Sequence, residues 1–183
     1  MKRRIFLTAG HHLKDSGAVG NGRKENSLTI EIRDMITERL KALSPDIVVW
    51  NDNDNDTLAQ VIAQINKIAT KDDFLLELHF DSSISPKASG ATALVAEGAR
   101  QNSKDFGKEL ADLGSAIMRV PNRGVKFESQ SNRGRLGILH TAASSVLYEV
   151  GFISNPTDVV NYENWKHWLA DDFARIIIKR LEM

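Results

Sequence analysis

Two kinds of apolar periodicity alternate along the chain, and this alternation most limits how it can fold. Short runs of consecutive apolar residues, typical of buried strands, alternate with longer segments whose apolar residues recur every three or four positions, typical of helices with one buried face. The expected strands are 5–7, 47–50, 74–80, 91–95, 136–139 and 146–150, and the expected helices are 28–43, 58–69, 103–118 and 162–181. This order predicts an α/β fold, a three-layer α/β/α sandwich with helices on both faces of a central, mostly parallel (mixed) sheet.

The length and composition favour a single domain over residues 1–183. The chain has 183 residues, 42% of them hydrophobic and 26% charged, values that exclude wholesale disorder, collagen and coiled coil. No internal repeat and no linker rich in proline or serine divides it. Lysine plus arginine and aspartate plus glutamate number 24 each, so the net charge gives no indication of a nucleic-acid partner or of stable membrane association.

The N-terminus does not have the pattern of an export signal. Lys2, Arg3 and Arg4 are basic, but the apolar stretch that follows, residues 5–7, is shorter than the ~7–15 residues of a signal peptide's apolar region. No apolar run approaches the ~18 residues of a membrane span. We therefore expect a protein made in the cytoplasm without a signal peptide of its own.

Cysteine is absent, so any metal ion must be held by histidine and carboxylate side chains. His11 follows the first strand directly after Gly10, Glu25 opens the first long helix, and His79 lies near the end of a buried strand. Strand ends are where α/β sheets bind ligands, and two imidazoles with one carboxylate are a ligand set of catalytic zinc. The separations of 14 and 54 residues follow no local rule, so surface or internally paired histidines remain an alternative from the pattern alone.

A further carboxylate, Glu149, lies inside an apolar strand two residues before Gly151. Partial desolvation would raise its pKa toward the range of a general base. The alternative is a structural ion pair with an arginine such as Arg133 or Arg135.

Four segments together resemble the zinc-dependent N-acetylmuramoyl-L-alanine amidases of the type-3 family, bacterial and phage cell-wall hydrolases. The likeness covers nearly the whole chain. The four segments are Gly10-His11 with Asp15-Ser16-Gly17-Ala18, Glu25-Asn26-Ser27-Leu28, Glu77-Leu78-His79-Phe80-Asp81, and Glu149-Val150-Gly151-Phe152-Ile153-Ser154-Asn155. The chain departs from the family pattern at Thr8-Ala9, His12, Asp81 and Ser144, none of which removes a ligand or the base.

The resemblance implies a phosphorylase/hydrolase-like fold and one Zn²⁺ per chain held by His11, Glu25 and His79, with Glu149 as the catalytic base. The implied reaction cleaves the amide between the lactyl group of N-acetylmuramic acid and L-alanine in peptidoglycan. An enzyme of this family without an export signal would act on the wall after host membrane permeabilisation, as a phage endolysin with a holin does, or would be an excised domain of a secreted amidase.

Two other functions remain open from the sequence. The first is a cytoplasmic zinc amidohydrolase or carboxypeptidase that acts on small peptides or N-acyl amino acids. The second is a non-catalytic wall-binding module, which would require the loss of a ligand or of Glu149, and neither is lost. The short stretch between His79 and Gly90 leaves no room for a long regulatory helix, so we expect an open site.

Several polar residues have no assigned role at this point. His12 is expected at the surface or beside the site, Glu77 either orients His79 or forms a buried ion pair, and His140 is a candidate substrate contact. His167 is expected in packing or at the surface. The acidic segment 51–56 lacks the glycine and glutamate of a calcium loop, so we expect a solvated loop that caps the next helix. Segment 119–135 is expected to be a flexible basic rim able to meet the carboxylates of peptidoglycan stem peptides.

Overall fold

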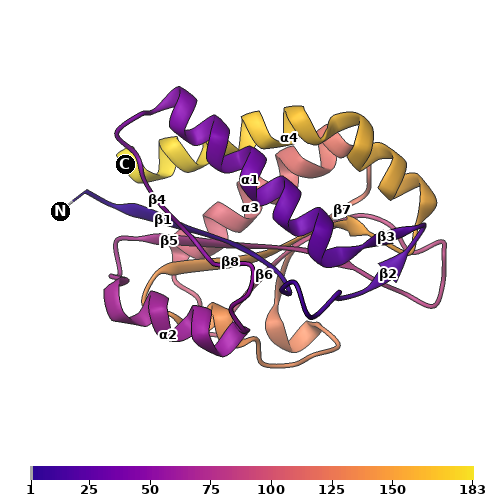
Figure 1. Cartoon of the computed structure of the whole chain (residues 1–183), viewed down its shortest axis with the longest axis horizontal. Helices are drawn as coiled ribbons and strands as arrows, with labels where there is room; N and C mark the ends of the chain where they lie inside the picture. Colours follow the sequence, from indigo (N-terminus) through magenta and orange to yellow (C-terminus); the bar gives the residue numbers. More distant parts are fainter. Residues whose placement is uncertain (1) are drawn as a thin grey trace.

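The protein is a six-stranded mixed sheet with helices on both faces, as a computed structural model describes it for residues 2–183 (Figure 1). The strand order is β4-β1-β5-β8-β6-β7, and the four strands β4, β1, β5 and β8 are parallel. β6 runs antiparallel to β8, and β7 follows the direction of β6. The predicted α/β fold with a mostly parallel mixed central sheet is confirmed.

The elements follow the predicted alternation. The sheet strands are β1 (Arg4–Ala9), β4 (Val48–Asn51), β5 (Phe74–Asp81), β6 (Ala91–Val95), β7 (Asn122–Phe127) and β8 (Ser144–Phe152). The α-helices are α1 (Glu25–Leu43), α2 (Leu58–Ile68), α3 (Gln101–Met118) and α4 (Pro156–Glu182). A small hairpin, β2 (Val19–Gly20) and β3 (Arg23–Lys24), precedes α1, and two 3-10 turns, η1 (Glu128–Gln130) and η2 (Gly137–His140), precede β8. None of the helices within residues 2–183 combines the length and the apolar character that a bilayer crossing requires.

Each face of the sheet has its own apolar core, because side chains alternate along a strand. Helices α1, α3 and α4 cover one face, where Ile5, Leu7, Leu76 and Leu78 are buried (Figure 1). The other face, under α2 and η2, buries Phe6, Leu75, Leu147, Val61 and Ile138. On β5 the residues that follow Leu75 on this second face are Glu77 and His79, so the face changes from apolar to polar toward the carboxyl ends of the strands.

Three boundaries differ from the sequence predictions. Residues 136–139 were expected as a strand, but Ile138 and Leu139 are buried from the 3-10 turn η2, since a four-residue apolar run is compatible with either state. Segment 119–135 was expected to be a flexible loop, but it contains the edge strand β7. This strand pairs only with β6, so few apolar side chains are needed to place it in the sheet. Helix α4 begins at Pro156 rather than at 162, because Asn155 caps it by accepting hydrogen bonds from the amides of Thr157 and Asp158.

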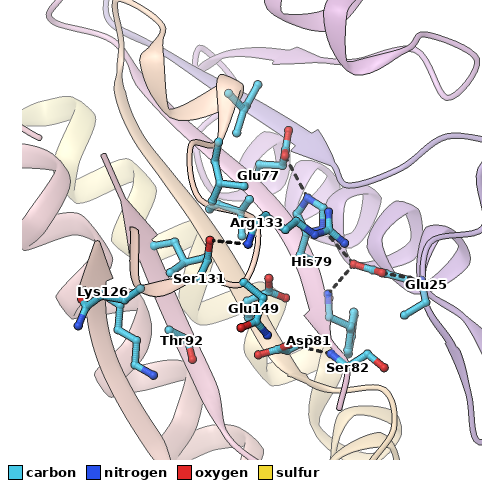
Figure 2. Close-up of a pocket in the computed structure, with 18 of the residues that line it drawn as sticks. Glu25, Glu77, His79, Asp81, Ser82, Thr92, Lys126, Ser131, Arg133 and Glu149 are labelled. Carbon is cyan, nitrogen blue, oxygen red and sulfur yellow. Dashed lines mark hydrogen bonds and ion pairs between the residues drawn. The ribbon is translucent and has the colours of Figure 1, made fainter. Parts of the chain in front are cut away.

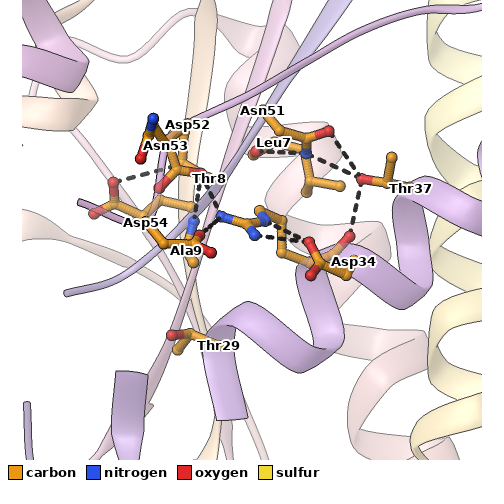
Figure 3. A network of polar contacts seen from close by, with 12 residues as sticks. Leu7, Thr8, Ala9, Thr29, Asp34, Thr37, Asn51, Asp52, Asn53 and Asp54 are labelled. Carbon is orange, nitrogen blue, oxygen red and sulfur yellow. Dashed lines mark hydrogen bonds and ion pairs between the residues drawn. The ribbon is translucent and has the colours of Figure 1, made fainter. Parts of the chain in front are cut away.

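A buried arginine of α1, Arg33, fixes the acidic segment 51–56 through Asp52 and Asp54, both labelled in Figure 3. The Nη1 atom of Arg33 lies 3.0 Å from Asp52 Oδ1 and 2.7 Å from Asp54 Oδ1, and Asp52 Oδ1 also accepts a hydrogen bond from the amide of Ala9 at 3.2 Å. Asp52 is buried, whereas Asn53 and Asn55 are exposed, so the segment is only partly solvated, and the expected cap of α2 is present at Thr57. The network therefore fixes the end of β1, where the polar face begins.

We predict that Arg33→Met lowers the free energy of unfolding by about 3–5 kcal/mol, since it leaves the buried carboxylate of Asp52 without its counter-charge. The measurement is urea denaturation followed by circular dichroism. Arg39→Met is the matched control, because Arg39 lies on the same helix as Arg33 but pairs at the surface with Asp171 of α4. This substitution should lower the free energy of unfolding by less than about 1 kcal/mol. Equal losses in the two variants would contradict the structural role of the Arg33 network.

Candidate metal centre

Three side chains of the type that binds metal ions meet at the carboxyl ends of two neighbouring parallel strands. His11 follows β1, His79 lies near the end of β5, and Glu25 is the first residue of α1. One ligand atom from each of the three lies within 4.8 Å of the others. The structure thus brings together His11, Glu25 and His79, although 14 and 54 residues separate them along the chain.

Glu25 is placed by backbone contacts as well as by the histidines. Its Oε2 atom accepts a hydrogen bond from the amide of Ala18 at 2.9 Å, and its Oε1 atom accepts one from the amide of Phe80 at 3.1 Å. The amide of Glu25 in turn donates to the carbonyl of Ala18. These bonds fix the carboxylate between the loop before the β2–β3 hairpin and the end of β5.

A second carboxylate orients each imidazole. His11 Nδ1 lies 2.8 Å from Asp15 Oδ2. His79 Nε2 lies 3.0 Å from Glu77 Oε1, as Figure 2 shows. The other nitrogen of each ring therefore faces Glu25: His79 Nδ1 lies 2.9 Å from Oε1, and His11 Nε2 lies 3.1 Å from Oε2. A carboxylate on the outer nitrogen is how metal-binding histidines are commonly held.

One of the donor atoms that face the centre of the cluster makes no hydrogen bond, so it could bind a cation. His11 Nε2 is buried and, despite its distance to Glu25, has no hydrogen bond of acceptable geometry. Burial opposes ionisation of Glu25, but the adjacent imidazoles of His11 and His79 hold its pKa well below its usual range. Burial likewise opposes the charged form of His79, but Glu25 and Glu77 raise its pKa to about 10. The residues present thus favour positive charge at their centre and fit a divalent ion with nitrogen and oxygen ligands.

Two glycines allow the ligands to approach the backbone closely. A Cβ atom at Gly10 would lie 2.3 Å from His79 Cε1. Gly17 has a φ of +63°, and a Cβ there would lie 2.5 Å from His11 Cδ2 and 2.6 Å from Glu25 Oε2. His11 itself has a φ of 70°, an unfavourable conformation for a residue with a side chain, and such strain is concentrated at functional sites.

Glu149 lies beside this cluster because of strand register. On β8 it is the parallel partner of His79 on β5 and the antiparallel partner of Thr92 on β6, so its side chain extends on the same face as His79. Burial raises the pKa of Glu149 to about 7, and its Oε2 atom is buried without a hydrogen-bond partner. The alternative of a structural ion pair is not what residues 2–183 show, since neither Arg133 nor Arg135 pairs with Glu149.

A cavity of about 400 Å³ adjoins Glu149 and two of the three metal-type side chains. Glu25, Glu77, His79 and Glu149 are among the residues that line it (Figure 2). A second cavity of about 210 Å³ reaches the other side of His79 and is lined by His11, His12 and Asp15 among others. The candidate metal centre thus lies where two cavities meet.

The remaining candidate residues are placed as follows. His12 is not one of the three residues that could hold a metal ion. Its carbonyl oxygen accepts a hydrogen bond from the side chain of Asn26, and its Nδ1 atom accepts one from the amide of Lys14. Asp81 lines the first cavity and accepts a hydrogen bond from the amide of Ser82 at 2.7 Å. His140 is turned to the carboxylate of Glu128, 2.9 Å away, and does not line either cavity. His167 is exposed.

Sequence reasoning assigned no role to Asp15. The signal for it was the spacing of four residues from His11, which alone is too common to be informative.

The fold and this cluster define an α/β enzyme with a candidate metal centre at the carboxyl edge of its sheet. The sequence profile of the N-acetylmuramoyl-L-alanine amidase family matches residues 5–179. The chain therefore belongs to this family of enzymes, as its four sequence motifs predicted.

Two Bacillus subtilis proteins are similar in sequence. The uncharacterized protein YqiI is 27% identical over 170 residues, which cover 91% of this chain and 79% of YqiI. The N-acetylmuramoyl-L-alanine amidase LytC of the same organism is 29% identical over 156 residues, which cover 84% of this chain but 30% of LytC.

Among solved structures, the catalytic domain of CwlV, an N-acetylmuramoyl-L-alanine amidase from Bacillus (Paenibacillus) polymyxa, superposes with a TM-score of 0.82. The two chains are 23% identical, and the match covers 98% of each. At this identity the likeness shows the shared fold.

We predict that Gly10→Ala weakens Zn²⁺ binding at least tenfold, because the new methyl group would displace the ring of His79. The affinity can be measured by competition with a chromogenic chelator. Gly98→Ala is the control, since no atom lies within 4 Å of a Cβ there. Unchanged affinity in the Gly10 variant, with a normal thermal transition, would show that His79 is not a ligand.

Proposed function

We propose that this chain hydrolyses the amide bond between the lactyl group of N-acetylmuramic acid and L-alanine in peptidoglycan, with one Zn²⁺ per chain. The observation that carries the proposal is that His79 and Glu149 are partners on adjacent strands. This pairing places the carboxylate of Glu149, whose pKa is raised, beside the three side chains that could hold a metal ion. Membership of the amidase family supports the choice of bond.

His11, Glu25 and His79 would hold the ion, because their inner atoms converge and their outer atoms are already bonded. A bound Zn²⁺ supplies Lewis acidity, which polarises a carbonyl group and lowers the pKa of water. Asp15 and Glu77 keep the two imidazoles in orientation, so their part in the reaction is to position ligands rather than to touch substrate.

Glu149 would act as the general base and then as the general acid. Its carboxylate accepts a proton from the attacking water and afterwards donates that proton to the nitrogen of the departing L-alanine. A pKa raised to about 7 suits both steps, since a base with this pKa is partly ionised near neutral pH and its conjugate acid is strong enough to protonate an amine. No ion pair engages the Glu149 carboxylate within residues 2–183, and its Oε2 atom has no hydrogen-bond partner, so the group is free for this proton transfer.

The place of action would be the cell wall, where the substrate lies. Delivery would follow either membrane permeabilisation, with a holin as partner, or export as part of a larger amidase. The small-molecule amidohydrolase considered from the sequence is the competing activity, and intact sacculi distinguish it from a wall hydrolase. Family membership favours the wall substrate.

We predict that Glu149→Gln lowers the release of stem peptides from purified sacculi by at least a hundredfold while the bound zinc stays stoichiometric, because the amide cannot accept the proton of water. Product release by mass spectrometry and metal content by atomic emission should be measured on the same sample. Glu97→Gln, an exposed residue outside both cavities, is the control and should keep full activity. Full activity in the Glu149 variant would end its assignment as the base.

A further inference from the structure

Three cationic side chains line the first cavity. Arg123 and Lys126 come from β7, and Arg133 comes from the loop that follows η1 and also lines the second cavity. Figure 2 shows Lys126 and Arg133. None of the three forms an ion pair with a carboxylate among residues 2–183. Their charge is therefore not neutralised by an ion pair, and the guanidinium of Arg123 is held over the ring of Phe152 and donates to the carbonyl of Ser89.

A β-bulge directs both residues of β7 into the cavity. Ala91 pairs with Asn122 and Ala93 pairs with Val125, so two residues of β7 stand opposite the single residue Thr92. Gly124 takes the left-handed conformation that this bulge requires, with a φ of +72°. Without the extra residue, Arg123 and Lys126 would lie on opposite faces of the strand. The bulge thus brings both to the cavity, whereas Val125 packs under α3.

The loop that carries Arg133 is fixed rather than flexible. The buried carboxylate of Glu128 accepts a hydrogen bond from the amide of Leu136 at 2.6 Å and lies 2.9 Å from His140 Nε2. Ser131 Oγ donates to the carbonyl of Glu128 at 2.7 Å. Both ends of the loop are thereby tied to one residue, which corrects the expectation of a flexible rim and gives His140 a structural role.

The cations of the neighbourhood are distributed unequally. The second cavity is lined by four acids, Asp15, Asp52, Asp56 and Glu77, and by Arg133. The first cavity is also lined by four acids, Glu25, Glu77, Asp81 and Glu149, but it has the three cations Arg123, Lys126 and Arg133. Cationic side chains that could bind an anionic group are therefore more numerous in the first cavity than in the second.

We propose that Arg123, Lys126 and Arg133 form a subsite for a carboxylate of the stem peptide, on the leaving-group side of the scissile amide. This proposal rests on the proposed amidase function. The N-acetylated sugars of the substrate are neutral, whereas the residue after L-alanine, a γ-linked D-glutamate, carries a free α-carboxylate in some walls and a carboxamide in others. Arginine and lysine bind the former by charge-assisted hydrogen bonds and gain little from the latter.

The test measures binding and cleavage separately. Binding uses L-alanyl-γ-D-glutamyl-L-lysine and its α-carboxamide, titrated into the zinc-loaded protein by calorimetry. Cleavage uses the corresponding N-acetylmuramoyl tripeptides. The variants are Lys126→Met and Arg133→Gln, with Arg135→Gln as the control, since Arg135 lies in the same loop but does not line the cavity.

We expect the wild type to bind the carboxylate peptide about tenfold more tightly than the carboxamide, and each variant to lose most of this preference. The Arg135 variant should behave as the wild type. Cleavage of both substrates without a preference, or equal losses on both in the variants, would overturn the subsite and leave the amidase function standing. Preferential binding that depends on Lys126 and Arg133 without any cleavage would support the subsite and overturn the amidase function.

Discussion

The carboxylate of Glu25 is the group on which the rest of this site depends. It lies between two imidazoles, 2.9 Å from His79 Nδ1 and 3.1 Å from His11 Nε2, and it also accepts two backbone hydrogen bonds. A buried carboxylate is costly unless it is paired, and here the partners come from two segments far apart in the sequence, the loop after β1 and the end of β5. The side chain of Glu25 therefore joins the loop after β1, the end of β5 and the first turn of α1. Its carboxylate also places negative charge where a cation would bind.

The site lies on one face of the sheet, which has an apolar half and a polar half. Leu75 and Leu147 are buried under α2 and η2, whereas Glu77, His79 and Glu149 lie farther along the same strands, beyond the cover of these elements. Polar groups at the uncovered half face a cavity rather than a core, so they cost less to desolvate and remain accessible to a substrate. The bulge in β7 extends the polar wall across the sheet to Arg123 and Lys126.

Much of this could be predicted from the sequence because it depends on local pattern. The alternation of periods identifies most strands and helices, and histidines next to strand ends indicate a site at the carboxyl edge of the sheet. Strand order is not local: the pairing of His79 with Glu149 requires β8 to lie beside β5, which no spacing encodes. The strand β7 escaped prediction because its bulge breaks the alternation, and the capping role of Asn155 was hidden among loop residues.

The most direct test of the proposed function is mass spectrometry of the soluble products from purified sacculi incubated with the protein, with and without a chelator. We predict free stem peptides that begin at L-alanine, lost on chelation and restored by added Zn²⁺. If no peptide is released from any sacculus while the protein holds stoichiometric zinc, the wall-amidase function is wrong and a small-molecule substrate takes its place.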